Sequence, residues 1–127
     1  CDVFAPCALG SSVNEITIPR LSAKIVCGAA NNQLLTSDDC TRLSDAGILY
    51  VPDFVANAGG VINVSFELNG EYDESAAKTK ASEIYGTTVR VLQMAENLSI
   101  TTEEAAKRIA EERLTSHGMH GSDKLRG

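Results

Sequence analysis

Three short runs of apolar residues mark the first half of the chain. They are continuous rather than alternating, which is typical of parallel strands buried on both faces. We therefore expect parallel strands over Asp2–Pro6, Ala23–Gly28 and Gly47–Asp53.

The segments between these runs carry weaker helical signals. Asn14–Leu21 predicts a short helix, which Pro19 limits because proline lacks a backbone N–H. Ser37–Ala46 predicts a better helix, since Ser37 can cap it and Gly47 can end it.

The second half of the chain has the periodicity of helices. Val61–Leu68 predicts one helix that Gly70 ends, and apolar steps of three and four predict a long helix from Asp73 to about Leu98. Thr101 and Glu104 form a capping box for a last helix.

This order of elements indicates an α/β fold. Three parallel strands make a poor sheet by themselves, because outer strands buried on both faces need neighbours. We therefore expect the second half of a Rossmann-like doubly wound domain followed by long C-terminal helices. The expected division is a partial domain over 1–70, helices over 71–115 and a disordered tail over 116–127. The long helix is expected to reach another domain or subunit.

Composition narrows the classes of partner. The 127 residues are 43% hydrophobic and 22% charged, which fits one globular domain. A net charge of −6 argues against nucleic acid and against an anionic membrane surface. Neither a transmembrane run nor a signal peptide is visible. The chain begins with Cys1 rather than Met, so we expect it to be processed or part of a longer protein.

The cysteines show no metal-binding spacing. No C-x-x-C pair or histidine cluster accompanies them, so we expect no zinc site. Cys27 lies in an apolar run, where a reduced cysteine behaves as a small hydrophobe, and we expect a reducing, cytoplasmic setting. The cysteines are Cys1, Cys7, Cys27 and Cys40.

Loops rich in small residues follow the three predicted strands. In open α/β sheets, ligands bind beyond the carboxyl ends of the strands. Small residues allow a flat ligand to lie against the main chain, and Asn31, Asn32 and Asn57 supply neutral donors and acceptors. The loops are Ala5–Gly10, Gly28–Leu34 and Phe54–Val61.

The stretches APCALG, AANNQL and PDFVANAGGVINV, in this order and spacing, resemble the nucleotide-binding domain of the glutamate/leucine/phenylalanine/valine dehydrogenase superfamily. The likeness is greatest to leucine and valine dehydrogenases. The resemblance implies reversible oxidative deamination of an L-amino acid to its 2-oxo acid and ammonium, with NAD as the cofactor.

The resemblance also implies which residues face the ligands. Main-chain atoms of the first loop would line the nicotinamide–ribose site, and the third loop would form the floor under the nicotinamide. The implied cofactor contacts are Pro6, Cys7, Ala8, Asn31, Asn57, Gly59 and Gly60. The implied substrate contacts are Asn31, which would reach the carboxylate, and Val61 and Val64, which would face the side chain.

Val64 carries information on specificity under this resemblance. Glutamate-specific relatives have a polar residue at this place, where it meets the substrate's side-chain carboxylate. A buried valine would leave that charge unpaired at a cost of several kcal/mol. We therefore expect a branched-chain substrate, with phenylalanine less favoured.

The chain also departs from the family pattern. It contains no G-x-G-x-x-G, no acidic residue about 20 residues later for the adenine ribose, and none of the family's substrate-binding and catalytic lysines or their partner aspartate. We assign no catalytic residue, and we expect the chain alone not to turn over.

Simpler interpretations stay open for single motifs. Gly59 and Gly60 could be a turn before a helix, and Val61 and Val64 ordinary helix core. Asp53 is interpreted as a structural loop residue.

The alternative function is a stand-alone, non-catalytic module. Such a chain would form a homo-oligomer that covers the strand edges and the apolar face of the long helix. It would bind a small ligand weakly or not at all. A homo-oligomer is also expected if the chain belongs to an enzyme. NADP in place of NAD stays open.

Overall fold

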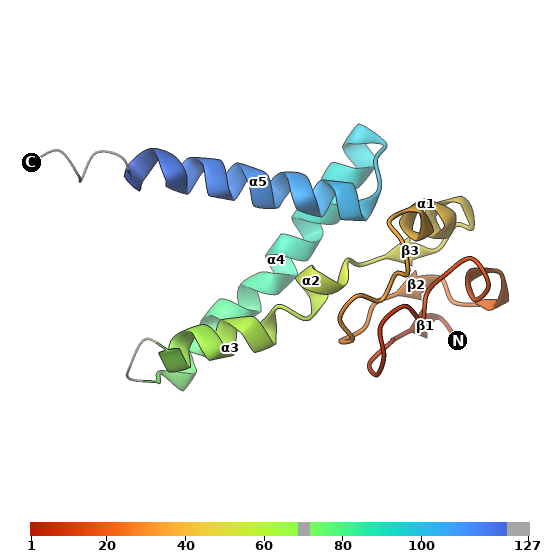
Figure 1. Ribbon diagram of the computed structural model, residues 1–127. Coiled ribbons are helices and arrows are strands. Elements are labelled where there is room, and N and C mark those ends of the chain that lie inside the picture. Colours follow the sequence, from red (N-terminus) through yellow and green to blue (C-terminus); the bar gives the residue numbers. More distant parts are fainter. Residues whose placement is uncertain (69–71, 122–127) are drawn as a thin grey trace, which may run out of the picture.

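The computed structural model describes residues 1–68 and 72–121. A small sheet with its connecting segments lies at one end, and the helices of the second half of the chain extend away from it (Figure 1). The elements in chain order are β1 (Val3–Phe4), η1 (Ile18–Arg20), β2 (Ile25–Val26), α1 (Asp38–Asp45), β3 (Leu49–Tyr50), α2 (Asp53–Ala56), α3 (Gly59–Leu68), α4 (Glu74–Leu98) and α5 (Thr102–Gly121).

The sheet confirms the prediction of three parallel strands. The strand order is β1-β2-β3, and Val26 of β2 lies between Phe4 and Tyr50 in register. Each strand is shorter than its apolar run, because only two residues form the regular ladder. Within this chain the outer strands lack cover, as expected for strands that need further neighbours: Val3 is 50% exposed and Leu49 is 40% exposed.

The helix expected over Asn14–Leu21 is only the 3-10 turn η1, which has Pro19 at its start. The Asn14 side-chain oxygen accepts hydrogen bonds from the N–H groups of Ile16 and Thr17. Asparagine competes with helical bonding in this way, so the segment closes into a turn instead of a helix.

The helix α1 confirms the prediction over Ser37–Ala46, but its cap differs. The Ser37 side chain makes no capping hydrogen bond. Instead Asp39 Oδ2 accepts from the N–H of Thr36 at 2.8 Å. Gly47 follows the helix with a φ of +69°, the left-handed conformation that favours glycine.

The helical half is close to the prediction but differs at its boundaries. The short helix α2 was not predicted, and α3 begins at Gly59 rather than Val61. Asp73 caps α4 as predicted, because its carboxylate accepts from the N–H of Ala76 at 3.0 Å. Helix α5 continues to Gly121, past the predicted start of the tail. Gly70 and residues 122–127 lie outside the described residues.

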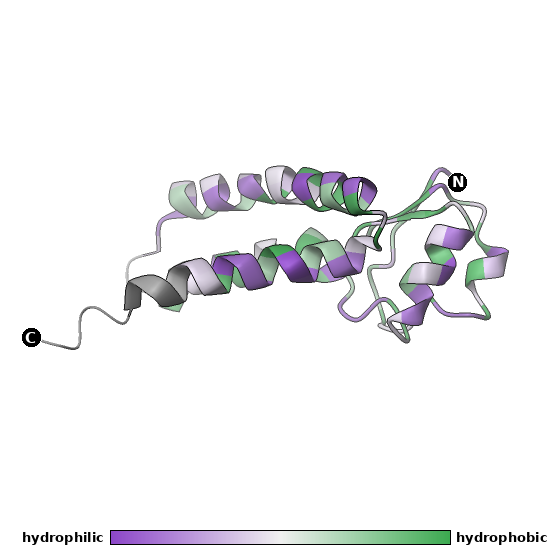
Figure 2. Ribbon diagram, turned by 90° about the horizontal axis from the view of Figure 1, so that it is seen from above, coloured by the Kyte–Doolittle hydropathy of each residue, from purple (hydrophilic) through white to green (hydrophobic). Residues whose placement is uncertain are grey.

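Two hydrophobic clusters stabilise the structure. One lies between the sheet, η1 and α1, and the other where α2, α4 and α5 meet. Figure 2 shows apolar and polar residues interspersed along the helices. The first cluster contains Val13, Ile18, Val26, Cys40, Leu43, Ile48 and Tyr50. The second contains Val55, Val91, Ala95, Ala105, Ala106 and Ile109.

Candidate functional site

The first two loops after the strands pack backbone against backbone. The N–H of Ala30 donates to the carbonyl of Pro6 at 2.9 Å, and the N–H of Ser11 donates to the carbonyl of Asn32 at 2.6 Å. A Cβ on Gly28 would lie 2.1 Å from the Pro6 oxygen, which no side chain tolerates. Gly28 therefore sets the spacing between the two loops.

Gln33 and Asp53 join the second loop to the third. Gln33 is fully buried, and its side-chain amino group donates to the carbonyls of Gly28 and Ala30 at 2.8 and 3.0 Å. Asp53 accepts from the N–H of Gln33 at 3.2 Å and from the N–H of Phe54 at 2.8 Å. Both carboxylate oxygens are thus used to hold main chain, in agreement with a structural role for Asp53.

Gln33 is a residue that sequence reasoning missed. Its side chain fixes the loop that carries the predicted site residue Asn31, although Gln33 does not itself line the same hollow. The available signal was a polar residue at the end of the loop, directly before the apolar pair Leu34 and Leu35. A buried polar side chain among apolar neighbours is expected to be satisfied by a specific partner.

The third loop contacts the second through a pair of amides. Asn57 Nδ2 donates to Asn31 Oδ1 at 2.6 Å and lies 3.4 Å from the carbonyl oxygen of Ala29. The structure thus brings together two residues that are 26 positions apart and that the sequence placed in one site.

An open hollow of about 510 Å³ lies beside this pair. Asp53 is the one charged residue that lines it, and its oxygens already accept backbone N–H groups. A hollow of this size, lined mainly by uncharged side chains, fits a flat polar ligand. The lining residues are Asn31, Asn32, Asp53, Phe54, Asn57, Ala58, Val61 and Ile62.

Gly59 and Gly60 are not a special turn. They form the first turn of α3, and among the glycines of the described ranges only Gly47 has a positive φ. A Cβ on Gly60 would meet nothing within 4 Å. Neither backbone conformation nor packing within the described residues therefore requires a glycine at position 60, and neither Gly59 nor Gly60 lines the hollow.

The two valines of α3 are not helix core within this chain. Val61 is 75% exposed and Val64 is 50% exposed, and Val61 lines the hollow while Val64 does not. Helix α3 has no buried residue although it is mainly apolar. An apolar helix face that the chain leaves exposed is available to a ligand or to other protein.

The first loop lies beside the second but outside the hollow. Pro6 is buried, whereas Cys7 and Ala8 are exposed. Burial, together with the neighbouring Cys7, raises the pKa of the Cys27 thiol, which favours its protonated form. All the cysteines are free, and no group of metal ligands occurs in the described residues.

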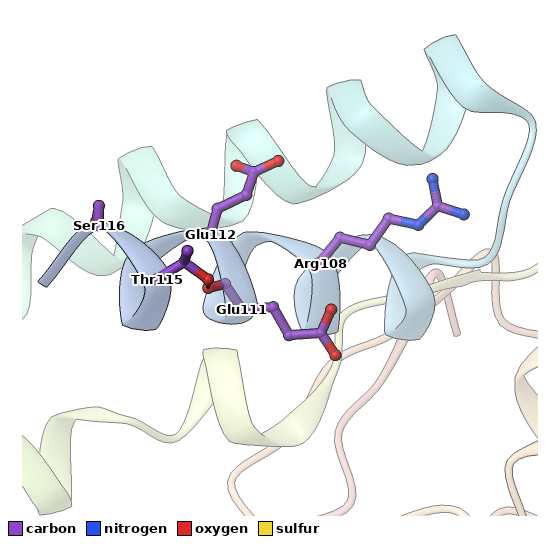
Figure 3. A pocket seen from close by; sticks show the side chains of 5 residues that line it. All are labelled: Arg108, Glu111, Glu112, Thr115 and Ser116. Atoms are coloured by element: carbon purple, nitrogen blue, oxygen red, sulfur yellow. Dashed lines mark hydrogen bonds between the residues drawn. The ribbon is translucent and has the colours of Figure 1, made fainter. Parts of the chain in front are cut away.

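A second hollow lies along the outer face of α5 (Figure 3). Its side chains all come from this one helix, and Glu111 and Glu112 point to different sides of it. Arg108 instead pairs with Glu104 at 2.7 Å. Among the described residues, no second element contributes a side chain to the lining of this hollow.

Comparison with known proteins gives a family match over residues 1–120, to the glutamate/leucine/phenylalanine/valine dehydrogenases. The chain belongs to this family. It is 52% identical over 113 residues to a valine dehydrogenase from Streptomyces coelicolor, covering 89% of this chain and 31% of that enzyme. It is 47% identical over 126 residues to a leucine dehydrogenase from Bacillus cereus, covering 99% of this chain and 34% of that enzyme.

The fold matches solved structures of this dehydrogenase family. The L-tryptophan dehydrogenase of Nostoc punctiforme superposes with a TM-score of 0.87 at 47% identity, over 91% of this chain and 34% of that one. The superfamily, its closeness to leucine and valine dehydrogenases and the Rossmann-like α/β class are thereby confirmed. The chain spans about a third of the length of these relatives.

None of the helices in the described part of this dehydrogenase-family chain is long and apolar enough to cross a membrane.

Proposed function

We propose that the chain is the carboxyl-terminal part of the cofactor domain of an NAD-dependent amino-acid dehydrogenase. The reaction would be the reversible deamination of a branched-chain L-amino acid to its 2-oxo acid and ammonium. The observation that carries this proposal is the hollow beside the Asn31–Asn57 pair, which lies at the carboxyl ends of the strands in a member of this family.

The residues present fit a nicotinamide. The carboxamide ring is flat, the hollow has neutral amides on one side, and the surface above Gly60 is open to close approach. The residues proposed to hold the cofactor are Asn31 and Asn57, which line the hollow, together with Pro6, Cys7, Ala8, Gly59 and Gly60, which do not line it. When bound, the cofactor would accept hydride from the α-carbon of the amino acid.

The substrate would lie between Asn31 and the start of α3. The amino group of the Asn31 side chain would donate to the substrate carboxylate, and Val61 and Val64 would contact an aliphatic side chain. The exposure of both valines supports this arrangement, because apolar side chains at a ligand site must be accessible.

Proton transfer is assigned to no residue of this chain. Asp53 is held by two backbone N–H groups, and Cys7 has no histidine beside it in the sequence. General acid–base work needs a positioned proton carrier at the reacting atoms. We infer that such groups come from other parts of the protein.

We also propose a homo-oligomer in a reducing, cytoplasmic setting. Leu68 is 81% exposed and Tyr85 is 79% exposed, and both are side chains that subunit contacts commonly bury. The free cysteines support the reducing setting.

An assay of the protein from its native gene tests the proposed function. Ammonium and NADH are supplied with 2-oxo-isocaproate, indole-pyruvate or 2-oxoglutarate, and NADPH replaces NADH in parallel. We expect the highest kcat/KM with 2-oxo-isocaproate and NADH. A preference for 2-oxoglutarate would contradict the substrate class, and no turnover with any oxo acid would favour the non-catalytic module.

A further inference from the structure

The amides of Asn31 and Asn57 have a defined polarity. Asn57 faces both the carbonyl oxygen of Ala29, at 3.4 Å, and Asn31, at 2.6 Å. A main-chain carbonyl can only accept a hydrogen bond, so the Asn57 atom beside Ala29 is the amino nitrogen. Two amino groups cannot bond to each other, so the Asn31 atom that faces Asn57 is its oxygen.

This polarity decides what Asn31 can offer to a ligand. With its oxygen held by Asn57, Asn31 keeps its amino group and both N–H donors for the hollow. Asn31 is exposed, so the surrounding protein does not otherwise restrict its side chain. Without Asn57, its amide could turn over and present the oxygen, which repels a carboxylate.

We propose that Asn57 is a positioning residue that keeps the amino group of Asn31 directed into the hollow, and that Ala29 fixes this direction through its carbonyl oxygen. The ligand group that this arrangement selects is an acceptor, the carboxylate of the amino acid or 2-oxo acid. The proposal rests on the proposed function, and it assigns to Asn57 a role that acts through Asn31.

A double-mutant cycle on the full-length protein tests this role. Asn57→Ala should raise the KM of the 2-oxo acid roughly five- to tenfold and change kcat less than about twofold, since one aligned hydrogen bond is lost. Asn31→Ala should raise the same KM at least as much. In the double variant, Asn57→Ala should add nothing to Asn31→Ala, because the group that Asn57 positions is already absent.

Asn63→Ala is the matched control. Asn63 also pairs through its amide, donating to Glu67 at 2.8 Å and accepting from Tyr72 at 2.7 Å, but it does not line the hollow. Its loss should leave the KM of the 2-oxo acid unchanged. An unchanged KM in Asn57→Ala, or equal effects of Asn57→Ala with and without Asn31, would overturn the proposal.

A measurement without turnover separates this proposal from the proposed function. In protein labelled with ¹⁵N-asparagine, the two alanine variants identify the side-chain NH₂ signals of Asn31 and Asn57. The Asn57 signal should exchange with water more slowly than the Asn31 signal, because only the Asn57 amino group is hydrogen-bonded. The opposite order would overturn the amide polarity even if the protein deaminates amino acids. The expected order in an inactive protein would leave the polarity standing while the dehydrogenase function fails.

Discussion

Gly60 and Gly86 are two helical glycines that differ in their surroundings. Neither would place a Cβ within 4 Å of another atom, but Gly60 lies in the first turn of α3 at the candidate site and Gly86 lies inside α4. A difference in ligand affinity between their alanine variants would therefore not come from a clash of the new Cβ within the described chain.

We predict that Gly86→Ala stabilises the protein by about 0.5–1 kcal/mol, because alanine loses less backbone entropy in a helix. Gly60→Ala should be neutral or stabilising as well, yet it should weaken NADH binding. Urea unfolding and calorimetric titration with NADH measure the two effects. Equal NADH affinity in both variants would show that the space above Gly60 is not used by the cofactor.

Tyr50 predicts a pH effect at the same scale. Burial, and next the charge of Asp53, raises the pKa of the Tyr50 hydroxyl far above its ordinary value of 10.0. The unfolded chain therefore ionises first as the pH rises, while the folded chain keeps its proton. The stability that the neutral tyrosine supports is present below pH 10 and is lost above it.

Tyr50→Phe removes this titration. Between pH 10 and 11 the wild-type free energy of unfolding should fall by about 1 kcal/mol more than that of the variant. The variant also loses the hydrogen bond from the Asp53 N–H at 3.3 Å, which is a constant offset at all pH values. Urea unfolding from pH 8 to 11 measures both, and parallel pH curves would contradict the assignment.

At the candidate site, the sequence indicated polar residues by their place in the loops, but not the contacts that hold these loops together. Asn31 and Asn57 are polar residues in loops beyond strands, and the structure brings them into contact. Gln33 could not be predicted, because its partners, the carbonyls of Gly28 and Ala30, depend on how the loop folds back. The contact of Gly28 with Pro6 could not be predicted either, because the two residues lie in loops that follow different strands.

At the scale of elements, α4 depends on its N-cap. We predict that Asp73→Ala lowers the free energy of unfolding by about 1 kcal/mol, because the Ala76 N–H loses its acceptor. Asp73→Asn should retain most of the stability, since asparagine caps as well as aspartate does. Chemical denaturation compares the three proteins. A loss of the same size in Asp73→Asn would mean that the charge, and not the cap, is responsible.

The predicted elements differed from the structure where an element is too short to show a periodic pattern. The continuous apolar runs predicted the strands correctly, and the apolar steps of three and four residues predicted α4 correctly. Both patterns arise because the apolar side chains of these elements are buried. The stretch Phe54–Ala56 was interpreted as loop, but it belongs to α2, whose Val55 is 8% exposed and packs in the helical cluster. A single turn of helix leaves too few periods to detect.

For the whole molecule, the packing of α5 onto α4 is the contact to test. Ile109 is 2% exposed in the helical cluster, whereas Leu114 on the same helix is 75% exposed. We predict that Ile109→Ala costs about 2–5 kcal/mol and Leu114→Ala less than about 0.5 kcal/mol.

The free energies of unfolding of the two variants check this prediction. A large loss in Leu114→Ala would mean that its exposed side chain is covered by protein outside the described residues. Such a result would also support the proposed oligomer. Sequence alone could not rank the two residues, because the exposed face of a helix is set by its neighbours.

The close backbone contact between Pro6 and Gly28 has a consequence for which substitutions this sequence can tolerate. The atoms in contact belong to the main chain, and proline has a fixed φ. The Pro6 backbone therefore cannot shift to make room for a side chain at position 28. In a library with every position randomised, substitutions at Gly28 should disappear under selection for folding alone. Substitutions at Gly60 should disappear only when survival requires activity. Comparing the two selections would then separate the glycines that folding requires from those that activity requires.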